Sequence, residues 1–203
     1  MVITVFSLIV LLFSVIIHEV AHGSVALYLG DPTAKYAKRL TLNPLKHLDP
    51  IGSVALPLLM LLFTGGQGPI FGWAKPVPIN PYNFKDQRWG ELKVSLAGPA
   101  TNFAVGILFA LIIRFFSLPE SLFLFFSIIS IYNFLLALFN LVPIPPLDGS
   151  HILFSLLSDK YRNFKIFLQQ YGLFILVFFI FFGVDFIFYA ANFFYSLISG
   201  QNY

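Results

Sequence analysis

The sequence predicts an all-α polytopic membrane protein, a bundle of about four to six transmembrane or re-entrant helices with a short extended loop region. The first observation is composition: 58% of the 203 residues are hydrophobic and 10% are charged, against about 25% charged in soluble domains. The second is a series of apolar runs long enough to cross a bilayer. The third is the placement of Lys and Arg between alternate runs. The length favours a single transmembrane domain over residues 1–203.

The first third of the chain contains one span and one shorter apolar segment. Val2–Leu29 would be about 42 Å long as a helix, which exceeds the ~30 Å hydrocarbon core and predicts tilt or protrusion. Ile51–Thr64 has 14 residues, too few to cross, so we expect a re-entrant or interfacial path. Residues 65–90 are rich in Pro and Gly, which predicts a loop with extended pieces, anchored at the interface by Trp73 and Trp89.

The second half of the chain contains the remaining spans. Leu92–Phe116 and Ser121–Leu141 each have the length and apolar character of a transmembrane helix. The prolines of VPIPPLDG end the second of them, and we expect a short helix over Gly149–Leu157. Ile166–Ser199 is apolar for 34 residues, too long for one ordinary span, so Gly183 and Asp185 mark a bend or a turn within it, and one crossing or two stay open.

The basic residues predict the orientation in the membrane. If the first span runs from outside to the cytoplasm and Ile51–Thr64 enters and returns, Arg114 is the only one of the twelve Lys and Arg residues outside. This distribution agrees with the positive-inside bias and predicts a multi-pass protein of the cell membrane. A complete crossing by Ile51–Thr64 would divide the basic residues between the two sides.

Composition also narrows the function classes. The absence of cysteine excludes disulfides and thiolate chemistry. The net charge of +3 comes from scattered Lys and Arg, with no basic stripe and no nucleic-acid motif, so no nucleic acid is expected as a partner. The expected environment is the lipid bilayer. Whether the chain forms a homo-oligomer is left open.

The sequence HEVAH places ionisable side chains inside the first span. On a helix, His18 and His22 project from one face about one turn apart, a spacing that suits two nitrogen ligands of one Zn²⁺. Glu19 can then reach a water on the metal, whose pKa zinc lowers toward ~7, and take its proton. The alternative is a pair of helix-packing histidines with Glu19 as an ion-pair partner. Each charged residue in an apolar helix costs about 2.5–3.5 kcal/mol, which favours the zinc interpretation.

A catalytic zinc ion needs a third protein ligand and one open position. Asp148 is best placed, because it follows a proline-rich break after a span, and such a break at membrane depth borders protein or a wet cavity. Asp is also favoured as the N-cap of the helix that would begin at Gly149, and both roles could coexist. The other candidates are His47, Asp49, His151 and Asp185.

Three motifs, in this order, resemble the site-2 protease family of intramembrane zinc metalloproteases. They are HEVAH in the first span, ELKVSLAGPATNF at the start of a middle span, and FNLVPIPPLDGSHIL after the next span. With their flanks they cover most of residues 1–157, and the resemblance is to a compact member without a PDZ domain. The resemblance implies His18, His22 and Asp148 as ligands of one Zn²⁺ per chain, with Glu19 as general base.

The resemblance also implies that Asn140 helps to bind the substrate carbonyl or its oxyanion. From the residues alone, this amide could equally form a hydrogen bond across helices. The implied activity is that of a zinc endopeptidase, which hydrolyses peptide bonds in or near the transmembrane segments of membrane proteins during regulated intramembrane proteolysis. The implied substrates are transmembrane proteins or peptides, such as a transcription-factor precursor or an anti-sigma factor, and remnant signal peptides stay open.

Topology gives a physical check on the ligand set. His22 and Asp148 lie at the same membrane level only if an even number of crossings separates their helix ends, so Ile51–Thr64 must not cross. The ligand set and the basic residues therefore favour the same topology, with the active site nearer the cytoplasmic face.

The remaining motif residues have structural interpretations. In AGPATN, Ala97–Asn102, small residues allow close helix packing, a kink is expected at Gly98 and Pro99, and Asn102 can bond across helices. We assign His47 and Asp49 to ordinary solvation in a basic loop. We assign His151 a supporting role beside the site.

Two rival functions remain at this stage. A transporter or channel would use the buried ionisable residues to carry protons or metal ions, but the sequence contains no internal repeat of the kind expected in transporters. A metal-binding scaffold without activity is expected to have lost its general base, and Glu19 is present.

Overall fold

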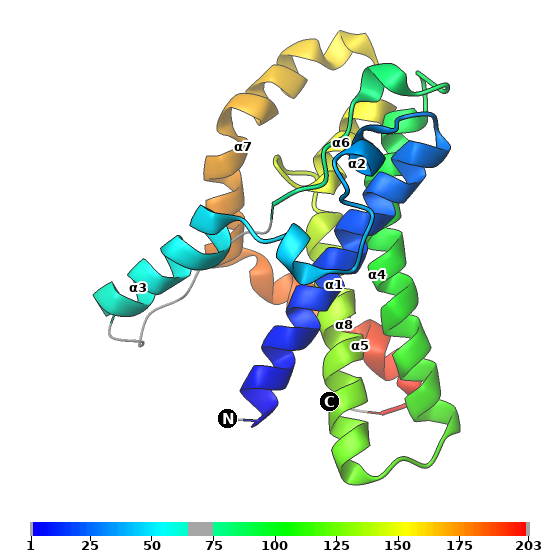
Figure 1. Ribbon diagram of the computed structural model, residues 1–203, viewed down its shortest axis with the longest axis vertical. Helices are drawn as coiled ribbons and strands as arrows, with labels where there is room; N and C mark the ends of the chain where they lie inside the picture. The colour runs from blue at the N-terminus through cyan, green and yellow to red at the C-terminus, as the bar shows by residue number, and fades with distance from the viewer. Residues whose placement is uncertain (1, 65–74, 202–203) are drawn as a thin grey trace.

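The computed structural model describes residues 2–64 and 75–201, and within these ranges it contains helices and loops but no β-strand. The predicted all-α class is confirmed (Figure 1). The α-helices are α1 (Val2–Tyr28), α2 (Thr33–Tyr36), α3 (Leu56–Thr64), α4 (Gly90–Phe115), α5 (Glu120–Asn140), α6 (Asp148–Leu156), α7 (Arg162–Phe182) and α8 (Val184–Ser199). A π-helical segment, Pro50–Ala55, leads into α3, and 3₁₀ turns occupy Pro44–Lys46, Pro81–Asn83 and Asp159–Tyr161.

Four helices of the described chain, α1, α4, α5 and α7, are long and apolar enough to cross a membrane. The protein is therefore a multi-pass membrane protein, as predicted. The spans begin and end within a few residues of the apolar runs, because those runs stop where charged residues, Pro or Gly begin.

Helix α4 forms the centre of the bundle and packs mainly against α5 and α1. Near the end distant from α6, side chains of α4, α5 and α8 form a buried cluster around Phe134 and Tyr195. Gly106 allows this contact, because a Cβ there would lie 2.7 Å from the Phe134 ring. Its loss of helix propensity is offset by close packing between α4 and α5.

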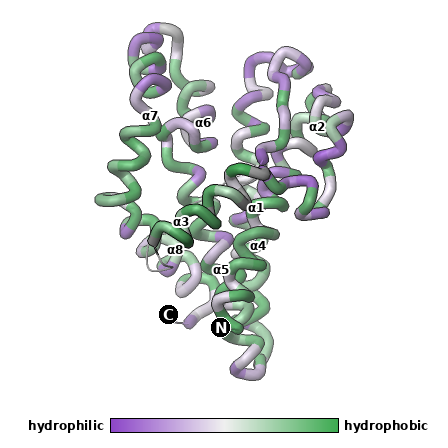
Figure 2. Tube along the Cα trace, turned by 60° about the vertical axis from the view of Figure 1, so that its left-hand side comes forward, coloured by the Kyte–Doolittle hydropathy of each residue, from purple (hydrophilic) through white to green (hydrophobic). Residues whose placement is uncertain are grey.

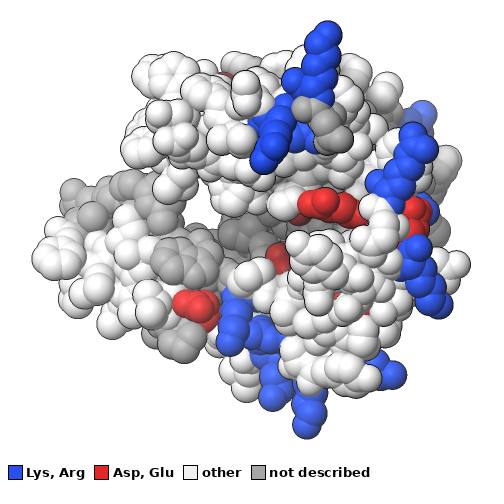
Figure 3. All heavy atoms as spheres, turned by 90° about the horizontal axis from the view of Figure 1, so that it is seen from above, with Lys and Arg blue, Asp and Glu red and all other residues white. Residues whose placement is uncertain are grey.

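The two ends of the bundle differ in polarity. Both termini and the α4–α5 connection lie at one end (Figure 1). At the other end hydrophilic residues gather around α2 and where α6 leads into α7, while the long helices are hydrophobic (Figure 2). Viewed from above, this second end carries a rim of Lys and Arg (Figure 3).

The short apolar segment does not form a transmembrane helix. Helix α3 has nine residues, about 13.5 Å of helix, and it projects sideways from the bundle (Figure 1). Its length agrees with the expectation that Ile51–Thr64 does not cross the membrane. Trp73, expected as an interfacial anchor, lies outside the described residues.

The last apolar run is broken at Gly183, as the sequence suggested. Helices α7 and α8 have few mutual contacts, so they do not form an antiparallel hairpin. Instead α8 packs against α5 and α4 and leads to the C-terminus, which lies at the same end as the N-terminus (Figures 1 and 2). The run therefore passes between the two ends of the molecule once, with a bend.

Candidate metal centre

Helix α1 presents the two histidines of HEVAH toward the interior of the bundle. His18 and His22 are 5% and 6% exposed, because the face of α1 that carries them packs against α4. Their spacing of four residues places both rings on that face, with ring centroids 4.6 Å apart.

Gly98 of α4 makes room for both imidazoles. A Cβ at this position would lie 2.4 Å from Nε2 of His22 and 2.5 Å from Nε2 of His18. The helix continues through Pro99 from Gly90 to Phe115. The AGPATN motif therefore does more than favour general packing, since its glycine leaves space that the two rings occupy.

Asp148 approaches the histidines from the other side. It is the first residue of α6, whose N-cap is Leu147, so the interpretation of Asp148 as N-cap is wrong. The preceding turn is tight: a Cβ at Gly149 would lie 2.3 Å from the carbonyl oxygen of Leu141, at the end of α5. This turn brings the start of α6 back toward α1, although 126 residues separate His22 from Asp148.

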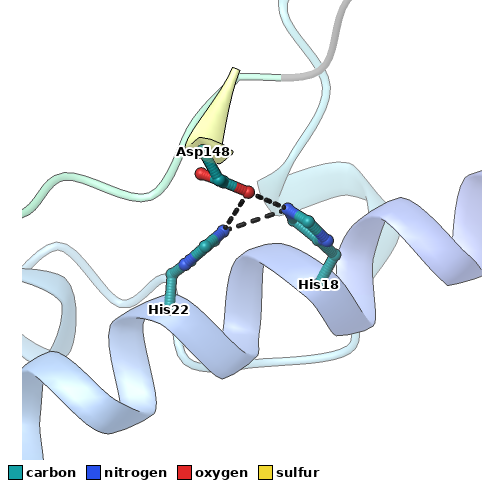
Figure 4. A group of neighbouring side chains, drawn as sticks. All are labelled: His18, His22 and Asp148. Carbon is teal, nitrogen blue, oxygen red and sulfur yellow. Dashed lines mark hydrogen bonds and ion pairs between the residues drawn. The ribbon is translucent and has the colours of Figure 1, made fainter. Parts of the chain in front are cut away.

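Three donor atoms converge at one point. Oδ2 of Asp148 lies 2.9 Å from Nε2 of His18 and 3.2 Å from Nε2 of His22, and the two Nε2 atoms are 3.0 Å apart (Figure 4). Within the described residues this is the one His, Asp and Glu group with the spacing of a metal site. Ligands at about 2.1 Å from a tetrahedral zinc lie about 3.4 Å from one another, so the observed triangle is slightly tighter than a zinc site.

The hydrogen-bond partner of His22 indicates that these residues fit a cation. Nδ1 of His22 lies 2.7 Å from the backbone carbonyl oxygen of Val94. A carbonyl can only accept, so Nδ1 carries the proton and a neutral His22 presents a bare lone pair at Nε2. That lone pair faces a carboxylate oxygen of Asp148. Two acceptors at this distance repel unless a proton or a metal ion lies between them, and two imidazoles with a carboxylate are zinc ligands.

Glu19 lies beside the donor atoms and is oriented by the backbone. Its Oε2 accepts a 2.8 Å hydrogen bond from the Val77 N–H, in the extended segment 75–80. Segment 75–80 is held in turn by Asp31, a fully buried carboxylate that accepts from the Asn80 N–H and from the Asn83 side chain, each at 2.7 Å.

The donor atoms open into a cavity of about 410 Å³. Glu19, Asn140, Glu91 and His151 also line it. Asn140 is at the end of α5, and its Nδ2 donates to the Leu136 carbonyl at 2.9 Å. The structure thus brings all five predicted site residues to one cavity: His18, Glu19, His22, Asn140 and Asp148.

The other candidate ligands lie apart from this group. His47 is 1% exposed and its Nε2 donates to the Thr41 carbonyl, so its assignment to ordinary solvation is wrong. Asp49 accepts from the N–H groups of Ile51 and Gly52 at the start of the π-helical segment. Asp185 is exposed in the first turn of α8.

His151 lines the cavity and forms an ion pair that the sequence analysis missed. Its Nδ1 lies 2.9 Å from Oε1 of Glu91, at the start of α4, and both side chains are about half exposed. Glu91 opens the middle motif, ELKVSLAGPATNF, and a lone carboxylate at the first turn of a span was the available signal. Glu91 raises the pKa of His151, burial opposes this, and the charge of Asp148 adds to the rise.

The chain is similar to known proteins of one family. A model described as peptidase family M50 matches residues 115–182, which include Asn140 and Asp148. YwhC of Bacillus subtilis, named as a candidate zinc metalloprotease, is 38% identical over 176 residues, 82% of this chain and 76% of that protein. No solved structure matches.

Two further relatives are longer than the matched region. Zinc metalloprotease MJ0392 of Methanocaldococcus jannaschii is 32% identical over 155 residues, 76% of this chain but 35% of that protein. Rip2 of Mycolicibacterium smegmatis, named as a candidate zinc metalloprotease, is 34% identical over 141 residues, 68% of this chain and 52% of that protein. The match therefore spans about a third and about half of these two relatives.

Proposed function

From the premise that this chain belongs to peptidase family M50, the site-2 protease family, and is a zinc metalloprotease, we propose that it is an intramembrane endopeptidase. It hydrolyses peptide bonds in or near the transmembrane segments of other membrane proteins. The observation that carries this proposal is the convergence of two imidazole nitrogens and one carboxylate oxygen within 3.2 Å, at the wall of a cavity in a membrane-spanning bundle.

His18, His22 and Asp148 would hold one Zn²⁺ through Nε2, Nε2 and a carboxylate oxygen. When bound, zinc supplies a Lewis acid that polarises a carbonyl and acidifies water toward a pKa of about 7. The cavity beside the three donor atoms leaves room for the open coordination position that catalysis needs.

Glu19 acts as general base. The Val77 N–H bonds to Oε2 and fixes the carboxylate in the cavity, which leaves Oε1 to accept a proton from the attacking water. The same carboxyl group then delivers that proton to the leaving amine nitrogen. Glu19 lies next to His18 in the chain but outside the group of three converging donor atoms, as a base rather than a ligand requires.

In this proposal Asn140 binds the substrate carbonyl. One Nδ2 hydrogen is used by the Leu136 carbonyl within α5, and the second is available to the cavity. An amide N–H aimed at the reacting carbonyl can stabilise the negative charge that develops on its oxygen.

The rim of Lys and Arg supports a cytoplasmic location for the end near the active site. Arg114, at the last turn of α4, lies at the opposite end and donates to the Leu197 and Ile198 carbonyls. A substrate helix must unwind locally beside the cavity, because intact helical hydrogen bonds shield its carbonyl groups. The protein thereby acts in the cell membrane, with its active site nearer the cytoplasmic face.

The test combines metal analysis with cleavage of a panel of single-span substrates, comparing wild type and Glu19→Gln. We expect about one zinc per chain in both proteins, and cleavage reduced by about 10²–10⁴-fold in Glu19→Gln. Zinc loss in Asp148→Ala would support the ligand set. Active protein that contains no metal, or Glu19→Gln that cleaves at the wild-type rate, would refute the proposal. Cleavage of soluble peptides alone would refute the intramembrane substrate.

A further inference from the structure

We propose that Asn102 and Asn133 form a buried amide relay that holds His18 in the tautomer able to bind a metal through Nε2. This inference rests on the proposed metal site. It assigns a positioning role to one residue on α4 and one on α5. Both lie outside HEVAH and outside the loop that carries Asp148.

The relay connects three helices inside the bundle. Oδ1 of Asn102, on α4, lies 2.6 Å from Nδ1 of His18, on α1. Nδ2 of Asn102 donates to Oδ1 of Asn133, on α5, at 2.8 Å, and to the Ser14 carbonyl at 3.1 Å. Asn102 is 0% exposed and Asn133 is 1% exposed, so water does not compete for these bonds.

The direction of every hydrogen bond follows from a backbone carbonyl at the far end. Nδ2 of Asn133 lies 2.8 Å from the Ile129 carbonyl, which can only accept, so the amide of Asn133 points its NH₂ there and its oxygen toward Asn102. That oxygen must receive an N–H, so Asn102 directs its NH₂ to Asn133. The Ser14 carbonyl imposes the same orientation independently.

With its NH₂ committed, Asn102 can offer only its oxygen to His18. Nδ1 of His18 must therefore carry the proton, and Nε2 is left as a bare lone pair toward the converging donors. The Val94 carbonyl imposes the same state on His22. Each imidazole is thus set by one acceptor on α4, and the acceptor for His18 is in turn set from α5.

A simple packing role for Asn102 does not account for this arrangement. Bonds to the Ser14 carbonyl and to Asn133 already join the helices through the NH₂ of Asn102, yet its oxygen forms the shortest bond of the network, with the candidate ligand. In a buried site, reversal of either amide would place two donors or two acceptors face to face, which costs about 1–3 kcal/mol. The relay thereby resists the wrong tautomer.

The test measures zinc affinity of the purified full chain by competition with a chromogenic chelator, so it does not depend on cleavage. Asn102→Leu removes the acceptor, and we expect a loss of about 10–100-fold. Asn102→Asp is the matched variant: it also loses the NH₂ bonds to Ser14 and Asn133, but it keeps an oxygen for His18. We expect Asn102→Asp to bind zinc at least tenfold more tightly than Asn102→Leu.

Two α5 variants test the outer half of the relay. Asn133→Leu should weaken zinc binding by about tenfold, while Ser130→Ala, which removes the buried bond to the Gly106 carbonyl one turn away, should leave it unchanged. Equal affinities of Asn102→Leu and Asn102→Asp, or of Asn133→Leu and Ser130→Ala, would overturn the relay. Wild type that fails to bind zinc would instead refute the metal site itself. Should Asn102→Leu not fold, the α5 pair decides.

Discussion

The candidate metal centre has two sides that are held in different ways. On the histidine side, formed by α1 and α4, both imidazoles are almost fully buried and each has its Nδ1 bonded to α4. On the aspartate side, formed by α6 and the loop before it, the Asp148 side chain is 20% exposed. Helix α6 packs against α4, and its polar attachments are the half-exposed pair of Glu91 and His151 and, at its other end, Lys165, which donates to the Phe154 and Leu157 carbonyls.

This difference indicates that the histidine ligands are held more rigidly than Asp148. Buried hydrogen bonds cannot be exchanged for bonds to water without loss, so the histidine side keeps one geometry. Exposed ion pairs contribute about 0–1 kcal/mol and are screened by salt, so the polar contacts of α6 are weaker than the buried bonds that hold the two imidazoles. We therefore expect the geometry of the two histidine ligands to be insensitive to salt. The placement of Asp148 should vary with the pH and ionic strength at the surface of α6.

The largest expected effect comes from Gly98→Ala on the histidine side. The new methyl group would occupy space that both Nε2 atoms need, and neither imidazole can move without losing its bond to α4. We expect zinc affinity to fall by more than about 100-fold. This loss is larger than the one expected when a hydrogen-bond partner of a metal ligand is replaced. Equilibrium dialysis against buffered zinc measures it.

Gly106→Ala is the matched control for that change. It adds a methyl group on the same helix, 2.7 Å from the Phe134 ring, and should lower stability by about 1–3 kcal/mol without weakening zinc binding. If Gly98→Ala and Gly106→Ala lost zinc affinity equally, the space that Gly98 leaves for the imidazoles would not explain the loss.

The second effect concerns Asp31, which anchors segment 75–80 and with it Val77, the donor to Glu19. Asp31→Asn places an NH₂ group against donors from Thr33, Asn80 or Asn83, and we expect a loss of about 2–4 kcal/mol. Thermal unfolding in detergent and proteolysis of segment 75–80 would show it. The partly exposed Asp86, paired with Lys93 and varied as Asp86→Asn, should change stability much less than Asp31→Asn does.

Asp31 also gives a pH signature. Burial tends to raise the pKa of Asp31, but its hydrogen bonds from Asn80, Asn83 and Thr33 outweigh this and hold the pKa below its usual range. The stabilisation is therefore complete above the pKa of the unfolded chain and is lost as the pH falls through the folded value. The difference in unfolding temperature between wild type and Asp31→Asn should shrink below about pH 4.

The smallest effect belongs to the aspartate side. Because Glu91 raises the pKa of His151, the pair stabilises the fold fully below the unfolded pKa of histidine and loses this contribution as pH rises through the folded value. Asp148 also raises this pKa and His22 lowers it. We expect a decrease in stability of less than about 1 kcal/mol between pH 6 and 8 in wild type, and none from this source in Glu91→Gln.

Salt provides the contrast between the two sides. High ionic strength should remove the Glu91-dependent difference in a pH series of thermal unfolding, since the pair is half exposed. It should leave the effects of Asn102 variants on zinc affinity in place. A Glu91 contribution that survived 1 M salt would contradict the weak attachment of α6.

Most of the fold could be predicted, because the apolar runs of the sequence correspond to its membrane-spanning helices. The spans, the non-crossing α3 segment and the break at Gly183 all follow from the length of each run and its interruptions. The N-cap interpretation of Asp148 failed because helix boundaries shift by one residue without a strong local signal. His47 was misassigned because its burial depends on segments far along the chain, including Lys75, whose N–H donates to the His47 carbonyl.

Site residues that lie close together in the sequence could be predicted. Contacts between site residues on different helices could not. HEVAH shows its spacing directly. The contact between His18 and Asn102 joins residues 84 positions apart, and the pair of Glu91 and His151 joins residues 60 apart. Such partners depend on the rotation of each helix about its axis, which periodicity cannot give for helices that are apolar on nearly all sides.

The separation of 130 residues between His18 and Asp148 has a consequence for biosynthesis. At translation rates of about 5–20 residues per second, α1 is made on the order of 10 s before its carboxylate partner. During that interval HEVAH enters the membrane without the carboxylate, and neutral imidazoles are the form that lipid tolerates best. The three-donor site that we propose for zinc is therefore incomplete until α6 has been made, late in translation.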